Sequence, residues 1–174
     1  MIKFDRSRRA FSLVEILFAV IIIGVLTAVA IPSLFSQKGK ADDSNAKQTI
    51  RTVQQLVRSA QDDSGSFITD ASGSLSGYLT TIEKDIKFVN GSTNAIVNGN
   101  TRTVSVSDPA ADIVYIVAQG GKNGSGDTYN CFGMYIDGTG STATKYYRYT
   151  KGKNSCQASQ VSGQTGIEGD FPLK

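Results

Sequence analysis

Residues 11–36 read FSLVEILFAVIIIGVLTAVAIPSLFS, and no charged residue occurs from Ile16 to Gln37. At about 1.5 Å per residue, a helix of this length is just long enough to span a bilayer. Gly24 and Pro32 interrupt the stretch, and both are tolerated in membrane helices when neighbouring groups satisfy the freed backbone. Burial of apolar surface is worth roughly 25 cal/mol per Å². The stretch therefore predicts a helix that lies in lipid or among other proteins.

An amphipathic pattern follows the apolar segment. Its apolar positions are spaced four, three, four and three residues apart: Ala46, Ile50, Val53, Val57 and Ala60. This spacing predicts one apolar stripe along a helix, and Leu56 widens the stripe. Gly65 is the expected C-terminal stop, so a continuous helix from Phe11 would be about 80 Å long. Its second half needs a globular domain to cover the stripe.

Short β-branched runs replace the helical pattern after Gly65. Residues 78–89 predict a short helix followed by a strand, and the stronger strand predictions are Arg102–Val106, Asp112–Ala118, Tyr129–Ile136 and Thr144–Tyr149. Turn-forming residues lie between them, at 98–100, 120–126 and 137–140. Consecutive strands joined by short turns predict an antiparallel sheet with one face packed on the helix stripe. The expected fold class is α+β, with a two-layer head.

Charge and composition narrow the function classes. The first ten residues have a net charge of +3, which equals that of the whole chain, because residues 11–174 hold 14 basic and 14 acidic side chains. A neutral body argues against a general nucleic-acid binder, and the basic end predicts a cytoplasmic flank under the positive-inside rule. The chain has no histidine and two cysteines. No catalytic constellation, metal site or cofactor is expected, and we expect a protein that is not an enzyme.

A motif stands directly in front of the apolar run, where residues 9–15 read RAFSLVE. This motif resembles the class III signal of type IV prepilins. In that family a basic leader and a small residue precede Phe-(Ser/Thr)-Leu-x-Glu and about twenty apolar residues. Ala10 stands where the family usually has glycine. The resemblance is close over residues 8–36 and covers the rest of the chain only in overall plan.

The resemblance implies cleavage between Ala10 and Phe11 on the cytoplasmic side by a prepilin peptidase, and usually methylation of the new Phe11 amine. It also implies that Pro32, together with Gly24, bends the helix. The implied parts are a cleaved leader over 1–10, a transmembrane or filament-core helix over 11–36, its amphipathic continuation over 37–65 and a β-rich head over 66–174. The implied partners are further copies of the chain in a helical filament, the peptidase/N-methyltransferase, and an inner-membrane assembly platform with its ATPase.

Glu15 is the residue with the clearest expected role. A carboxylate in a bilayer-embedded helix costs about 2.5–3.5 kcal/mol at the centre and less near an interface, so such a residue marks a functional site. In a filament core, the Phe11 ammonium of one subunit would be buried without a partner, and Glu15 of a neighbour can neutralise it. Breaking a buried pair costs about 3–5 kcal/mol, so the pair can select the register of assembly.

Two competing hypotheses for the N-terminus stay open. One is a secretory signal peptide cut at Ala28-Val29-Ala30, since an A-x-A site follows an apolar region. Against it, Glu15 immediately precedes that region and Pro32 lies two residues after the cut. The second hypothesis is a plain single-span anchor for an unrelated extracytoplasmic domain, which leaves the motif and the amphipathic continuation as coincidence.

Two features of the C-terminal half have structural and functional interpretations. Cys131 and Cys156 follow an export segment and predict a disulfide, worth roughly 3.5 kcal/mol. In the family a disulfide near the C-terminus commonly brackets a variable surface region. Four cations of this region alternate with or follow tyrosines: Lys145, Arg148, Lys151 and Lys153. They predict either a strand with one packed and one solvated face, or a contact with DNA or another surface polymer.

The expected function is structural. The chain is interpreted as a type IV pilin, the subunit of a surface filament that serves motility, adhesion or DNA uptake. The alternatives are a type II secretion pseudopilin and a minor or DNA-binding competence pilin. The expected location is the inner membrane as a single-pass protein with its head outside the cytoplasm, and then the extracellular filament.

Overall fold

The computed structural model describes residues 11–98, 101–124, 126–164, 167–168 and 171. The chain divides into two compact units, Met1–Gln37 and Lys38–Lys174. One helix, α1, spans Leu13–Ser59 and contains 47 residues. The predicted continuous helix is therefore confirmed. The apolar sequence of the first unit and the amphipathic sequence of the second belong to the same element.

The end of α1 differs from the prediction. The helix stops at Ser59, before the expected stop at Gly65. Asp62 explains the difference, because its Oδ1 accepts the backbone N–H groups of Ser64 at 3.0 Å and Ser66 at 2.9 Å. An aspartate that bonds nearby backbone groups in this way competes with the helix. Gly65, with φ of 87°, serves as the left-handed residue of that turn instead.

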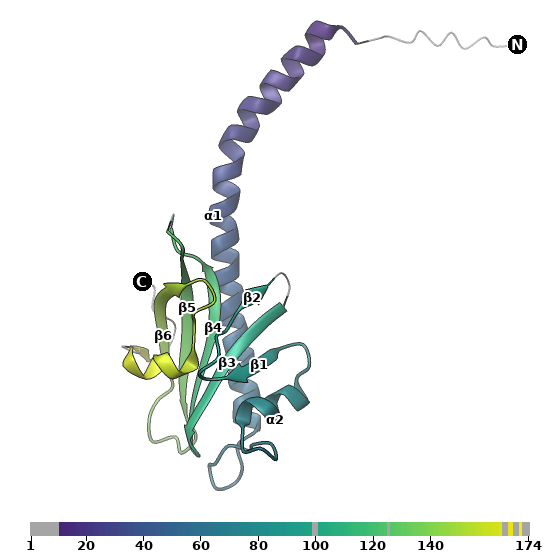
Figure 1. Ribbon diagram of the computed structural model, residues 1–174. Coiled ribbons are helices and arrows are strands. Elements are labelled where there is room, and N and C mark those ends of the chain that lie inside the picture. The colour runs from purple at the N-terminus through teal and green to yellow at the C-terminus, as the bar shows by residue number, and fades with distance from the viewer. Residues whose placement is uncertain (1–10, 99–100, 125, 165–166, 169–170, 172–174) are drawn as a thin grey trace, which may run out of the picture. The chain divides into compact units, whose positions relative to one another are not determined.

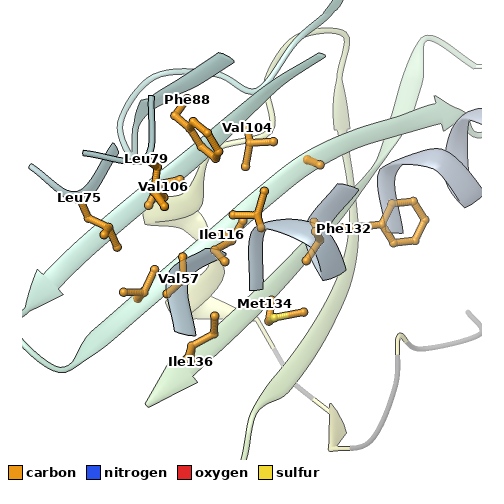
Figure 2. Packing of buried hydrophobic residues seen from close by; sticks show 14 of the residues in the cluster. Val57, Leu75, Leu79, Phe88, Val104, Val106, Ile116, Phe132, Met134 and Ile136 are labelled. Carbon is orange, nitrogen blue, oxygen red and sulfur yellow. The ribbon is translucent and has the colours of Figure 1, made fainter. Parts of the chain in front are cut away.

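The second half of α1 buries the predicted stripe. All five of its apolar positions are at most 1% exposed: Ala46, Ile50, Val53, Val57 and Ala60. They form one core cluster with Leu75 and Leu79 and with inward-facing side chains of the sheet. Figure 2 shows part of this cluster, with Val57 of α1 among labelled side chains of α2 and the sheet. Leu56 is partly buried and packs against the cluster, as the sequence predicts.

The sheet follows α1 and a short helix, α2, in the chain (Figure 1). Within the described residues it has seven strands in the order β1-β3-β4-β5-β6-β7, with β2 paired to β3. The element bounds are α2 Leu75–Ile82, β1 Lys87–Asn90, β2 Val97–Asn98, β3 Thr101–Ala110, β4 Ile113–Lys122, β5 Thr128–Asp137, β6 Lys145–Gly152 and β7 Ile167–Glu168. The four stronger strand predictions coincide with β3 to β6, and the predicted helix-then-strand pair corresponds to α2 and β1.

One strand pairing differs from the expected antiparallel pattern. β1 pairs with β3 in parallel, whereas the remaining pairings are antiparallel. A parallel pair requires the chain to cross back before the second strand begins. Residues 91–98 belong to that connection, and β2 lies within it. The sequence has turn signals there, but it does not indicate whether the next strand runs parallel or antiparallel to β1.

A second cluster covers the other face of the sheet, since side chains alternate between faces along each strand. Its centre is the disulfide between Cys131 and Cys156 and the short 3-10 helix η1, Ala158–Gly163. The Ala158 N–H donates to the Ser105 hydroxyl at 3.1 Å. The Tyr149 hydroxyl donates to the carbonyl of Gln157 at 3.1 Å, and burial raises the pKa of Tyr149. The disulfide pairing predicted from the sequence is present.

Candidate assembly segment

The first unit exposes a large apolar surface. Every described side chain from Phe11 to Gln37 is exposed, including fifteen large apolar ones: Phe11, Leu13, Val14, Ile16, Leu17, Phe18, Val20, Ile21, Ile22, Ile23, Val25, Leu26, Val29, Ile31 and Leu34. By length and composition this part of α1 is able to cross a membrane. Monomeric soluble proteins rarely expose contiguous apolar surface of this size, so the segment marks a site of insertion or association.

Three hydroxyl groups inside this segment form hydrogen bonds with carbonyl groups of their own helix. The Thr27 hydroxyl lies 3.0 Å from the carbonyls of both Ile23 and Gly24, and the Ser33 hydroxyl donates to the Ala30 carbonyl at 2.9 Å. The Ser36 hydroxyl likewise donates to a carbonyl three residues earlier, at 3.1 Å. An unpaired hydroxyl in an apolar medium costs several kcal/mol. These local bonds therefore let the three hydroxyls enter hydrocarbon or a protein core without losing their partners.

Glu15 is the only charged residue from Phe11 to Gln37. It lies in the first turn of α1, where its N–H donates to the Ser12 carbonyl at 3.0 Å. The N-terminus of a helix carries partial positive charge, which favours a carboxylate in the first turn. Phe11 precedes the helix and its side chain is 75% exposed. This arrangement leaves the Glu15 carboxylate available to a group outside its own helix.

The structure describes only some of the positions predicted for this segment. Ala10, the leader and the N-terminal side of the predicted cleavage site lie outside the described residues. Gly24 and Pro32 both lie within α1, which is continuous through them. A Cβ built on Gly24 would meet no atom within 4 Å, so the glycine is not required by packing within the subunit. The predicted bend at these two positions stays a prediction.

The four cations near the disulfide do not form one surface. Strand alternation in β6 places Arg148 on the face toward α1, and Lys145 and Lys151 on the opposite face. The guanidinium of Arg148 lies 6.0 Å from the ring centroid of Phe132, and its Nη2 donates to the Asn130 side chain at 3.4 Å. Lys153 follows the strand in a turn and is exposed. Arg148 therefore has a structural environment, and the predicted polymer contact by all four cations stays a proposal that this arrangement weakens.

Asp43 has a structural role that the sequence does not reveal. The Asp43 carboxylate is bound by the Gly121 N–H and the Asn130 side-chain amide. The partners lie far along the chain, in the hairpin of β4 and β5. Only the tertiary pairing reveals them. Among the described residues, no group of three or more His, Cys, Asp or Glu side chains is placed to hold a metal ion.

Comparison with known proteins points to the same segment. Residues 5–31 match the family described as a prokaryotic N-terminal methylation motif. A curated relative, the type II secretion system core protein G of Dickeya chrysanthemi, is 30% identical over 69 residues. The matched stretch covers 40% of this chain and 45% of that protein, so it spans a little under half of the relative's length. No solved structure matches the chain significantly.

Proposed function

We propose that this chain, which carries the class III signal of the type IV pilin and pseudopilin family, is a structural filament subunit that assembles through residues 11–37. The observation that supports this most is the uncovered apolar surface of α1 joined to a folded head. Such a surface is unstable in water at roughly 25 cal/mol per Å². A membrane hides it before assembly, and a bundle of identical helices hides it afterwards.

The proposed course begins at the inner membrane. The chain inserts with its basic leader in the cytoplasm and its head outside, as the positive-inside rule favours. A prepilin peptidase removes residues 1–10 between Ala10 and Phe11 and methylates the Phe11 amine. An assembly platform and its ATPase then extract the subunit into the growing filament. Membrane and filament core thus hold the same apolar segment in turn.

The assembly step includes one specific polar contact in this proposal. The Phe11 ammonium of one subunit is neutralised by Glu15 of a neighbour, because no other charge lies between Phe11 and Gln37. Subunits in the wrong register would leave two charges unpaired in an apolar core, at about 3–5 kcal/mol for each broken pair. The pair therefore selects register while the apolar surface supplies most of the association energy.

Two filament types fit this function. The Cys131–Cys156 disulfide near the C-terminus favours a pilus subunit, as in the family pattern described above. The similarity to a type II secretion core protein favours a pseudopilus, and it makes this the second candidate. A DNA-binding minor pilin has less support, because Arg148 packs toward α1 rather than beside Lys145 and Lys151.

The test is intact mass and N-terminal sequencing of the protein from native membranes and from sheared surface filaments. We expect a chain that begins at Phe11 with one extra methyl group in both fractions. A chain that begins at Ile31 would show an ordinary exported protein, and an uncut chain confined to membranes would show a plain anchor. Loss of an exported enzyme on deletion, with no surface filaments in the wild type, would identify the pseudopilus.

A further inference from the structure

A β-bulge in β4 turns a backbone N–H group toward α1. Between Gln119 and Lys122, β4 advances three residues while the facing strand β5 advances two. The extra residue removes one amide from the regular ladder, as bulges do. The Gly121 N–H donates instead to Oδ1 of Asp43, at 2.7 Å. The sheet thereby offers the helix a directed hydrogen bond near the start of its packed half.

The second oxygen of the same carboxylate is also bound. Oδ2 of Asp43 accepts the side-chain amide of Asn130, on β5, at 2.8 Å. Asn130 is 3% exposed, and its Oδ1 accepts from Arg148 at 3.4 Å. Arg148 therefore donates to Asn130, and Asn130 in turn donates to Asp43. Hydrogen bonds to a charged acceptor are stronger than neutral ones, and a buried asparagine needs its partners.

Two glycines allow this close approach of helix and hairpin. A Cβ on Gly121 would overlap the backbone of Gly39, one helical turn before Asp43. A Cβ on Gly120 would lie 2.5 Å from Oδ1 of Asp43 and 2.6 Å from the Phe132 ring. A Cβ on Gly39 would lie 3.4 Å from the carbonyl oxygen of residue 122, which is an ordinary van der Waals distance. The backbone of β4 at Gly121 thus packs directly on the backbone of α1 at Gly39, and a side chain at 121 would force the two elements apart.

We infer that Asp43, Asn130 and the glycines at 120 and 121 form a lock that fixes the axial position of the second half of α1 on the sheet. The apolar stripe from Ala46 onward holds the helix to the sheet, but apolar contacts are not directional. The lock supplies direction and register at the end of the helix where the chain enters the second unit, at Lys38.

The location of the lock gives it a role in assembly, and this part of the inference rests on the proposed function. Any force on residues 11–37, during extraction or within a filament, enters the head through Lys38 and the turns that follow. The lock is the first polar contact that force meets along α1 in the described structure. It keeps the turns at 38–46 seated on the hairpin of β4 and β5 while the subunit is extracted and packed.

Hydrogen exchange of the full-length protein in detergent micelles tests the lock. Asp43→Asn places a second amide donor against Asn130, and we expect roughly tenfold faster exchange at residues 39–46, with β4 and β5 nearly unchanged. Combining it with Asn130→Asp gives every donor an acceptor again, because the carboxylate at 130 accepts from Arg148 and from the amide at 43, whose oxygen still accepts the Gly121 N–H. We therefore expect exchange to return toward the wild-type rate. Gly121→Ala opens the same contact by sterics and is expected to act like Asp43→Asn.

Asp42→Asn is the matched control, because no hydrogen bond to a described residue is found for the Asp42 carboxylate. Unchanged exchange at 39–46 in Asp43→Asn, or failure of the paired substitution to restore it, would overturn the inference. Faster exchange spread evenly over the head would also overturn it, since that shows a general loss of stability. The yield of sheared filaments should fall in Asp43→Asn and recover when Asn130→Asp is added. A wild type without surface filaments, in which deletion also leaves protein export unchanged, would refute the proposed function, while exchange would still decide the lock.

Discussion

Cys131, in the middle of β5, is joined by a disulfide to Cys156, and their Cα atoms lie 5.6 Å apart. Both residues are fully buried. The bond ties the segment that leads into η1 to the sheet face that α1 does not cover. Cys156 also forms a bridge to Ala95, whose N–H donates to the Cys156 carbonyl at 2.7 Å. The disulfide and the backbone bridge together therefore join three parts of the chain that are distant in sequence.

Replacing both cysteines by alanine should lower the free energy of unfolding by about 3–4 kcal/mol, because a loop of 25 residues is no longer closed in the unfolded chain. The midpoint of denaturant unfolding, followed by near-ultraviolet circular dichroism in detergent, measures the change. Reduction of the wild type should give the same shift, and the alanine variant should not respond to reductant. A loss below about 1 kcal/mol would contradict the prediction.

Ile50→Ala should cost about 2–5 kcal/mol, because Ile50 is fully buried at the centre of the stripe and its removal leaves a cavity. Gln55→Ala, on the exposed side of the same helix, is the control and should change stability by less than about 0.5 kcal/mol. Thermal unfolding of both variants measures the difference. Equal effects of the two substitutions would show that the stripe does not hold α1 to the sheet.

The helix and the main strands could be predicted from the sequence because their signals are local. The stripe from Ala46 to Ala60 repeats with helical spacing, and β3 to β6 are β-branched or aromatic runs between turn residues. The early end of α1 could not be predicted, because the side chain of Asp62 decides it by bonding the backbone of a turn. The parallel pairing of β1 could not be predicted either, because it depends on the path of the chain between β1 and β3, for which the sequence carries only turn signals.

The candidate assembly segment could be predicted almost entirely from the sequence, because its function depends on composition and on one motif of adjacent residues. The lock could not. Asp43 and Gly121 are 78 residues apart, and their contact needs a bulge whose sequence signal, two adjacent glycines, also fits an ordinary turn. Arg148 shows the reverse case. Its neighbours in sequence favour a surface contact, but strand alternation turns its side chain toward α1.

Asp137 should stabilise the head above pH 3.8 and lose that effect in acid. Its Oδ1 accepts the Thr139 hydroxyl at 2.7 Å and the Thr139 N–H at 2.9 Å, and its Oδ2 accepts the Thr142 N–H at 2.8 Å. These bonds, the Thr139 hydroxyl first, lower the pKa of Asp137 below the usual 3.8 although burial opposes them. Because the folded pKa is the lower one, stability falls as pH drops from about 3.8 through the folded value.

Thermal midpoints of wild type and Asp137→Asn between pH 7 and pH 2 measure this contribution. The variant should be less stable at pH 7, because its amide would face the Thr142 N–H with a donor, and it should lose less stability in acid. Asp63→Asn is the control, since Asp63 is exposed and no hydrogen bond from its carboxylate to a described residue is found. Parallel acid curves for Asp137→Asn and the wild type would contradict the assignment.

Glu15→Gln should abolish or strongly reduce filament assembly while leaving the chain in the membrane. The apolar surface of residues 11–37 is unchanged by the substitution, so insertion is retained and only the partner of the Phe11 ammonium is lost. An unpaired buried charge costs about 3–5 kcal/mol, which is roughly a 100-fold to 1,000-fold loss in association at each contact. The yield of sheared filaments relative to membrane-bound protein measures the effect.

Thr27→Val is the matched control, because the Thr27 hydroxyl bonds carbonyl groups of its own helix and its removal should leave assembly intact. When Glu15→Gln is expressed together with wild type, it should enter mixed filaments below its share of the total. Incorporation in proportion to expression would show that Glu15 does not select register.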